Sequence, residues 1–166
     1  DKIDQDYQSR AVVIVPGGGV FADQVRQVQK QWQFDDRTAH LMAIHAMQQM
    51  ALLFKALKPS FIFTASIGQI SNQINQQGIY IWSPDVTELD STGIPSSWDI
   101  TSDSLSAWLA KTLFADELIL VKSVTIDADF DVVKLVQKQI VDASFHKFTQ
   151  QTKKKKKIIN AEEFIS

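Results

Sequence analysis

Three consecutive glycines, Gly17, Gly18 and Gly19, separate an apolar segment at 12–15 from a helical pattern at 20–28. The apolar segment consists of four β-branched residues, which favours a strand covered on both faces, as in a parallel sheet. Glycines after such a strand let a ligand approach the main chain, and the unpaired amides of a helix start attract anions. The turn therefore predicts an anion site, such as a phosphate site. A tight turn without a ligand is equally compatible, because the segment matches neither a Walker loop nor G-x-G-x-x-G.

Two charged residues follow on the same expected helix. Asp23 and Arg26 are three residues apart, so they share one helix face. Arg26 could hold a phosphate or carboxylate through its two-pronged set of donors. The same spacing also suits an exposed ion pair that binds nothing. Both interpretations stay open at this point.

A second group of polar residues lies in the C-terminal half. Thr101, Ser102 and Asp103 open a helical pattern, whereas Lys122 and Ser123 follow an apolar strand. Asp103 can be a residue favoured by the helix dipole and nothing more. Lys122 stands at the C-terminal end of a strand, where open α/β sheets bind ligands. It is therefore either a phosphate partner or a solvated lysine.

The remaining candidates point away from metal or polyanion chemistry. His40 and His45 are five residues apart on an expected helix, which places them on different faces. We therefore expect packing or surface roles and no metal ligands. Five lysines at 153–157 could bind a polyanion, but we expect a solvated, mobile loop there.

These residues must be positioned by strands that alternate with helices. Strands are expected at 12–15, 61–65, 79–82, 117–121 and near 158–159, and helices at 20–28, 35–58, 67–77, 104–114, 130–138 and 142–150. The segment 85–98 is expected to be a loop, and the strand at 117–121 a central one. The alternation favours an α/β fold with a mainly parallel sheet. With neither a repeat nor a long linker, we expect a single domain over 1–166.

Composition narrows the class of protein. The chain has 166 residues, of which 45% are hydrophobic and 22% charged, and its net charge is −2. No basic field points to nucleic acid, and no apolar run is long enough for a membrane span. The sequence holds no cysteine, so disulfides, thiolate catalysis and cysteine zinc sites are excluded. We expect a cytoplasmic protein.

Three phrases of the sequence are informative in combination. They are Val-Pro-Gly-Gly-Gly at 15–19, Trp-Asp-Ile-Thr-Ser-Asp-Ser-Leu-Ser-Ala-Trp-Leu-Ala at 98–110, and Ala-Asp-Glu-Leu-Ile-Leu-Val-Lys-Ser at 115–123. Together they resemble the amino acid kinase superfamily, which includes acetylglutamate, aspartate, uridylate and isopentenyl phosphate kinases. The resemblance covers roughly residues 11–146. It implies a three-layer α/β/α sandwich and an ATP-dependent small-molecule kinase that uses Mg²⁺.

The resemblance also implies roles for the candidate residues. The glycine turn, with Asp23 and Arg26, would hold the acceptor near the transferred phosphoryl group, and Thr101 and Ser102 would assist. Asp103 would organise the catalytic groups. Lys122 and Ser123 would belong to the nucleotide site. A homodimer is the default assembly in this superfamily.

Two further segments resemble a narrower branch. They are Ala-His-Leu-Met-Ala-Ile-His-Ala-Met at 39–47 and Ile-Val-Asp-Ala-Ser-Phe at 140–145, and they accompany the turn at 98–103. The branch comprises short archaeal and methylotroph kinases, some of which act on an aminomethylfuran methyl phosphate in methanofuran-type cofactor synthesis. A kinase of that kind is the specific expectation.

The sequence departs from the family pattern in two places. The family begins with a strand that ends in a Lys-x-Gly-Gly-Ser-like turn, whose lysine binds the nucleotide phosphates, and nothing before Arg10 supplies this turn. Many members also have a later Gly-Gly-Met...Lys segment with a second phosphate-binding lysine, whereas no glycine follows Gly93 here. Phosphoryl transfer depends on positioning and charge neutralisation, so missing phosphate-binding lysines would weaken activity. We expect either a piece of a longer kinase that lacks the first strand or a repurposed kinase fold. The repurposed form would bind an anion or serve assembly without turnover.

Overall fold

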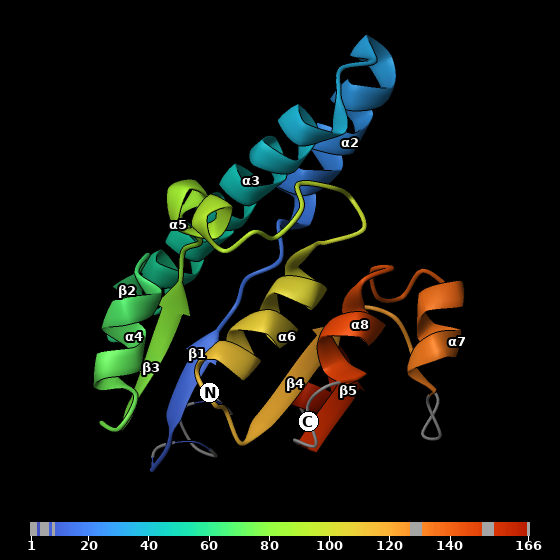
Figure 1. The fold of residues 1–166 in the computed structure, drawn as a ribbon. Helices are drawn as coiled ribbons and strands as arrows, with labels where there is room; N and C mark the ends of the chain where they lie inside the picture. The colour runs from blue at the N-terminus through green and yellow to red at the C-terminus, as the bar shows by residue number, and fades with distance from the viewer. Residues whose placement is uncertain (1–2, 4–6, 8, 127–130, 151–154, 166) are drawn as a thin grey trace. The chain divides into compact units, whose positions relative to one another are not determined.

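Every strand pair in the described part of the chain is parallel (Figure 1). The computed structural model describes residues 3, 7, 9–126, 131–150 and 155–165. The chain divides into two compact units, Ile3–Trp98 and Asp99–Ser166. Each unit pairs its own strands and surrounds them with its own helices, which confirms the predicted α/β class.

The first unit is built on a three-stranded sheet. Its order is β1 (Ala11–Ile14), β3 (Gly78–Trp82) and β2 (Ile62–Thr64). The register places Val13 of β1 and Ile62 of β2 opposite Tyr80 of β3. Tyr80, Ile81 and Trp82 are almost completely buried, so β3 forms the centre of this sheet.

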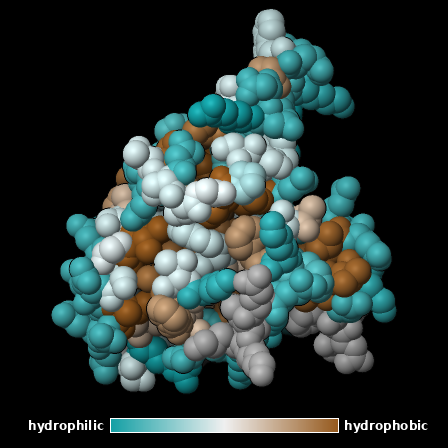
Figure 2. All heavy atoms as spheres, viewed as in Figure 1, coloured by the Kyte–Doolittle hydropathy of each residue, from teal (hydrophilic) through white to brown (hydrophobic). Residues whose placement is uncertain are grey.

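Two long helices follow β1 and pack against each other. They are α2 (Gly19–Trp32) and α3 (Asp36–Leu57). The carboxylate of Asp35 caps α3 by accepting the amide of Thr38 at 2.8 Å, and Pro59 follows the helix end. The end of this helix pair that extends beyond the sheet has a mostly hydrophilic surface, as expected for a part that faces solvent (Figures 1 and 2).

Two shorter helices complete the first unit. They are α4 (Ile67–Gln73) and α5 (Val86–Ser91). Helix α4 is shorter than predicted, and Gly78 opens β3 instead of ending a helix. Helix α5 lies in the segment expected to be a loop. Its cap is local, because the Asp85 carboxylate accepts the amide of Glu88 at 2.8 Å.

The second unit is organised around two strands. They are β4 (Glu117–Lys122) and β5 (Lys155–Asn160), accompanied by α6 (Ser102–Thr112), α7 (Val132–Gln137), α8 (Phe145–Gln150) and α9 (Ala161–Ile165). Their shared core contains Ala107, Leu120, Ile126, Leu135, Val141, Phe145 and Ile158. The short helix α9 has no counterpart among the predicted elements.

Two expectations about these strands are wrong. Within the described ranges β4 pairs with β5 alone, so it is not the central strand of a sheet. Lys155, Lys156 and Lys157 belong to β5 and not to a loop. Glu117 faces this strand and forms ion pairs with Lys155 at 3.6 Å and Lys157 at 3.3 Å, which offsets the repulsion between neighbouring lysines. Residues 153–154 and 130, also part of predicted features, lie outside the described residues.

Candidate functional site

The glycine turn delivers the start of α2 to an accessible position. Gly18 is the N-cap, with φ −72° and no side chain to cap the helix, and Gly19 has φ +51°. The first helical bond runs from the amide of Ala22 to the carbonyl of Gly18 at 3.2 Å. The amides before Ala22 therefore have no partner within the helix, and the positive end of the dipole lies there. Gly17 and Gly19 are exposed, so an anion can reach this turn.

The glycines also have a packing role. A Cβ atom on Gly18 would lie 2.5 Å from the Cβ atom of Ala22 and 3.2 Å from that of Ala46. A Cβ atom on Gly19 would lie 3.1 Å from the sulfur of Met50. Close contact between α2 and α3 thus requires small residues here, whether or not an anion binds.

Arg26 is fixed on the same helix face. Gly19, Asp23 and Arg26 are separated by four and then three residues, so they line one face of α2. Nη1 of Arg26 donates to Oδ1 of Asp23 at 3.0 Å, and both side chains are more than half exposed. The guanidinium lies 4.7 Å from the ring centroid of Trp98. The ion pair, one of the two interpretations left open by the sequence, is present, and it engages Nη1 of the guanidinium.

Asp103 and Lys122 meet in the second unit. Nζ of Lys122 donates to both carboxylate oxygens of Asp103, at 3.0 and 2.8 Å. Asp103 lies in the first turn of α6 and is only 9% exposed, whereas Lys122 is the last residue of β4. Burial raises the pKa of Asp103, and the attraction of Lys122 opposes that rise. Two predicted site residues that are 19 positions apart are therefore one charged pair.

The start of α6 depends on a residue that the sequence analysis did not single out. Oδ2 of Asp142 accepts the amide and hydroxyl of Thr101, at 2.7 and 2.9 Å, and the amide of Ser104 at 3.0 Å. The hydroxyl of Ser104 donates to Oδ1 of the same carboxylate. Asp142 was expected to begin a helix, but α8 starts at Phe145. Its carboxylate instead caps α6 from a distant part of the chain.

The remaining candidates flank the pair along the chain. Ser102 is the half-buried first residue of α6, next to Asp103, and Ser123 is exposed directly after Lys122. These residues belong to the second unit, whereas the glycine turn and Arg26 belong to the first. Each unit thus carries its own cluster of predicted site residues.

The two candidate histidines, His40 and His45, have separate structural partners. Nδ1 of His40, a buried residue of α3, lies 3.2 Å from the carbonyl oxygen of Ser97. Nδ1 of His45 lies 2.8 Å from Oε1 of Gln48. Burial lowers the pKa of His40, so its neutral form is favoured. Among the described residues, no group of three or more His, Asp or Glu side chains is placed to hold a metal.

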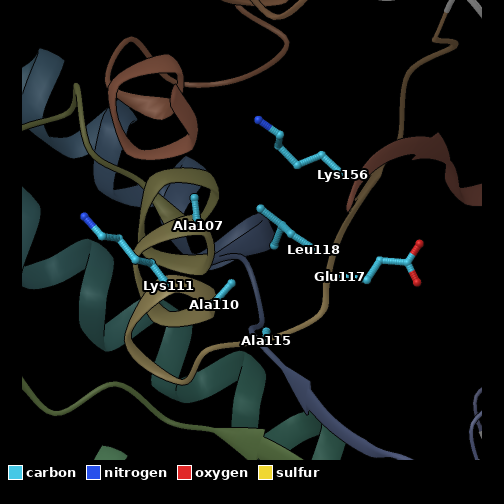
Figure 3. Close-up of a pocket in the computed structure, with 7 residues that line it drawn as sticks. All are labelled: Ala107, Ala110, Lys111, Ala115, Glu117, Leu118 and Lys156. Atoms are coloured by element: carbon cyan, nitrogen blue, oxygen red, sulfur yellow. The ribbon is translucent and has the colours of Figure 1, made fainter. Parts of the chain in front are cut away.

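A small hollow lies at the other end of α6. Ala107, Ala110, Lys111, Ala115, Glu117, Leu118 and Lys156 line it (Figure 3). These residues come from the C-terminal half of α6, the turn after it, the start of β4 and the start of β5, whereas Asp103 and Lys122 lie at the opposite ends of α6 and β4. The hollow is therefore not part of the Asp103–Lys122 cluster, and ligands of parallel sheets bind at the C-terminal strand ends.

Comparison with known proteins relates this geometry to a family. The model of the Amino acid kinase family matches residues 1–150. A curated relative, [5-(aminomethyl)furan-3-yl]methyl phosphate kinase of Methanocaldococcus jannaschii, is 29% identical over 116 residues, which are 70% of this chain and 53% of the relative. The chain thus spans about half the length of that relative.

A solved structure shows a similar fold. The crystal structure of uridylate kinase from Archaeoglobus fulgidus superposes with a TM-score of 0.70 and 17% sequence identity, covering 96% of this chain and 80% of that one. This likeness confirms the expected α/β fold of the amino acid kinase type. In the part of the chain that the structure describes, no helix is long and apolar enough to cross a bilayer. The family match extends over most of the chain, and the chain belongs to the amino acid kinase family.

Proposed function

We propose that this protein transfers a phosphoryl group from ATP to a small acceptor that carries a phosphate or a carboxylate. The observation that carries the proposal is the partly buried Asp103–Lys122 pair, found in a member of a kinase family at the end of a parallel strand and the start of a helix. Such a pair fixes a positive charge in one place. Phosphoryl transfer needs fixed positive charge, because negative charge spreads over the phosphoryl oxygens in the transition state.

The proposed roles follow from the donors that each group presents. Two N–H groups of Lys122 are directed to Asp103, which leaves the ammonium a third donor for a nucleotide phosphate oxygen. Asp103 positions Lys122, and the hydroxyls of Ser102 and Ser123 assist at the same site. Thr101, whose amide and hydroxyl donate to Asp142, holds the start of α6 in place. Lys122 already holds both oxygens of Asp103, so this carboxylate is not proposed as a ligand of Mg²⁺. In this proposal the ion is bound together with ATP.

The first unit supplies the acceptor site in this proposal. The amides at Gly17, Gly18 and Gly19, with the guanidinium of Arg26, bind the anionic group of the acceptor. Asp23 keeps one edge of that guanidinium in place. The acceptor's own oxygen attacks the γ-phosphorus of ATP, the new oxygen–phosphorus bond forms, and the bond to the β-phosphate oxygen breaks to release ADP. No protein nucleophile is required.

The specific acceptor we propose is an aminomethylfuran methyl phosphate, as in methanofuran-type cofactor synthesis. The support is the likeness to [5-(aminomethyl)furan-3-yl]methyl phosphate kinase, at 29% identity. Such an acceptor carries a phosphate monoester, which suits a site built from helix-start amides and one arginine. We also propose, from the family resemblance, a single kinase domain acting as a cytoplasmic homodimer.

A coupled assay of ADP release with the full-length protein tests the proposal. ATP, Mg²⁺ and [5-(aminomethyl)furan-3-yl]methyl phosphate are expected to give steady turnover. Lys122→Met is expected to lower it at least about a hundredfold, whereas Lys134→Met, which changes an exposed lysine of α7, leaves it unchanged. Phosphate binding without any turnover, for acceptors bearing either phosphate or carboxylate, would favour the alternative of an anion-binding or assembly module.

A further inference from the structure

We propose that Trp98 is a positioning residue for Arg26 and, with Gln29, presets the guanidinium for the anionic group of the acceptor. The inference rests on the proposed function, in which Arg26 binds that group. Neither the family match nor the sequence analysis gives Trp98 or Gln29 a role in positioning Arg26. The evidence is a chain of contacts that lies wholly within the first unit.

The first contact fixes the plane of the guanidinium. Arg26 lies over the Trp98 ring at 4.7 Å from its centroid, and Nη1 bonds to Asp23. An arginine side chain that is half exposed samples many rotamers in water. Stacking on an indole limits that freedom and leaves the edge donors available to a ligand. Trp98 thus lowers the entropy that is lost when Arg26 binds an anion.

The second contact fixes the indole. The Nε1–H group of Trp98 donates to Oε1 of Gln29 at 2.7 Å. Gln29 is itself held, because its Nε2 donates to Oδ1 of Asp36 at 2.8 Å and to the carbonyl of Phe34 at 3.2 Å. Both N–H donors of this amide and one lone pair of its oxygen are therefore engaged, which fixes the orientation of the amide. The hydrogen bond from Nε1 to this oxygen in turn fixes the orientation of the Trp98 ring.

The third contact fixes the backbone next to Trp98. The carbonyl of Ser97 lies 3.2 Å from Nδ1 of His40, which is buried in α3. The chain entering Trp98 is thus tied to α3, while the ring of Trp98 is tied to α2. Trp98 and Gln29 thus form a unit, here called the bracket, that is anchored to α2 and α3, and Arg26 lies over the ring of Trp98.

A titration with inorganic phosphate tests this bracket in the full-length protein. The readout is the Nε–H resonance of Arg26 by NMR, which the ring current of Trp98 is expected to shift because the guanidinium lies 4.7 Å from the ring centroid. In the unchanged protein we expect a shifted resonance that moves on addition of phosphate. Trp98→Leu is expected to remove the ring-current shift and to weaken phosphate binding about five- to tenfold. Trp98→Phe is expected to recover part of both effects.

Two further variants separate the bracket from the anion site itself. Arg26→Gln lacks the arginine signal, so phosphate binding to it is followed by the backbone amide resonances of Gly17, Gly18 and Gly19. This substitution is expected to abolish the phosphate binding that Trp98→Leu only weakens, and Trp32→Leu, which changes an exposed tryptophan of α2, is expected to leave binding unchanged. If Arg26→Gln binds phosphate normally, the proposed role of Arg26 is wrong. If Arg26→Gln loses binding while Trp98→Leu retains it in full, the bracket is wrong and the acceptor site stands.

Folding and kinetics complete the test. Gln29→Leu keeps the ring of Trp98 but removes its hydrogen-bond partner. If Trp98→Leu does not fold, this variant tests the bracket in its place. In acceptor kinetics, Gln29→Leu and Trp98→Phe are expected to raise KM severalfold and to leave kcat within twofold. A fall in kcat with unchanged KM would overturn the proposal, because the bracket would then act on chemistry and not on binding.

Discussion

Asp103 is a carboxylate that is almost out of water, and its partner decides what it can do. An ionised carboxylate in such a place needs a charged, hydrogen-bonded neighbour, and Lys122 meets it through both oxygens. The pair as a whole has no net charge, yet it holds an ammonium at the end of β4. The organising role that the family resemblance implies for Asp103 stays a prediction, and holding Lys122 is the way in which this carboxylate would fill it.

The raised pKa of Asp103 predicts how stability changes with pH. Burial favours the neutral acid, so the folded protein binds this proton more tightly than the unfolded chain does. The resulting stability is present below the unfolded pKa of about 3.8 and is lost as pH rises through the higher folded pKa. Asp103→Asn should therefore gain stability relative to the unchanged protein as pH rises above 3.8. Unfolding measured by urea between pH 3 and 7 checks this, and the opposite trend would mean that Lys122 outweighs burial.

Asp142 predicts a separate effect on stability. Its carboxylate accepts four hydrogen bonds from Thr101 and Ser104, and bonds to a charged group contribute more than neutral ones. We expect Asp142→Asn to lower the free energy of unfolding by about 1–3 kcal/mol. The matched control is Asp131→Asn at the exposed cap of α7, where the carboxylate accepts one hydrogen bond from the amide of Val133. Equal losses in urea unfolding would show that Asp142 is an ordinary cap.

At the scale of elements, the contact between α2 and α3 gives the clearest prediction. A Cβ atom on Gly18 would lie 2.5 Å from that of Ala22, so the helix start must move. We expect Gly18→Ala to cost about 1–3 kcal/mol of stability, as for other overpacked sites. Gly68→Ala in α4 is the control, because its Cβ atom would lie 3.6 Å from its nearest described neighbour, Oγ of Ser66, and alanine favours helices. Thermal unfolding that ranks the two variants the other way would contradict the packing argument.

The sequence predicted elements well where their signals are local. Helix α3 begins at its Asp35 cap and ends before Pro59, as expected. Helix α5 carried a local signal too, Asp85 with Glu88 three residues later, but the glycine and proline that follow favoured a loop. The lysines of β5 could not be placed from sequence, because their strand depends on pairing with β4, nearly forty residues away.

The same distinction applies to the candidate site. The glycine turn and the Asp23–Arg26 pair are local in sequence, and both are present. The resemblance named Asp103 and Lys122, but only the structure joins them, because their contact depends on how α6 lies against β4. The cap from Asp142 could not be read from spacing, since it joins residues 38 and 41 positions apart.

At the scale of the whole molecule, the proposed homodimer has a surface in the first unit that could form it. Helix α3 exposes Leu52, Leu53 and Leu57, and the edge strand β2 exposes Ile62 and Phe63. Burying such residues against a second copy removes apolar area from water. We expect the full-length protein to sediment as a dimer and Leu53→Glu to shift it to monomer.

Val133→Glu is the control for that experiment, because Val133 is an equally exposed apolar residue of α7 in the second unit. It is expected to leave the dimer intact. A monomeric unchanged protein, or a dimer insensitive to Leu53→Glu, would contradict this assignment of the surface.

Turnover by Asp103→Asn tests the central claim, that the partly buried Asp103–Lys122 pair serves phosphoryl transfer. Asparagine keeps the size of the side chain but cannot hold Lys122 as a charged partner. In the full-length protein with ATP and [5-(aminomethyl)furan-3-yl]methyl phosphate, we expect ADP release to fall at least about a hundredfold, or roughly 2.7 kcal/mol of barrier, without a fall in the melting temperature. A fall of less than threefold, accompanied by a lower melting temperature, would show that Asp103 only stabilises the start of α6.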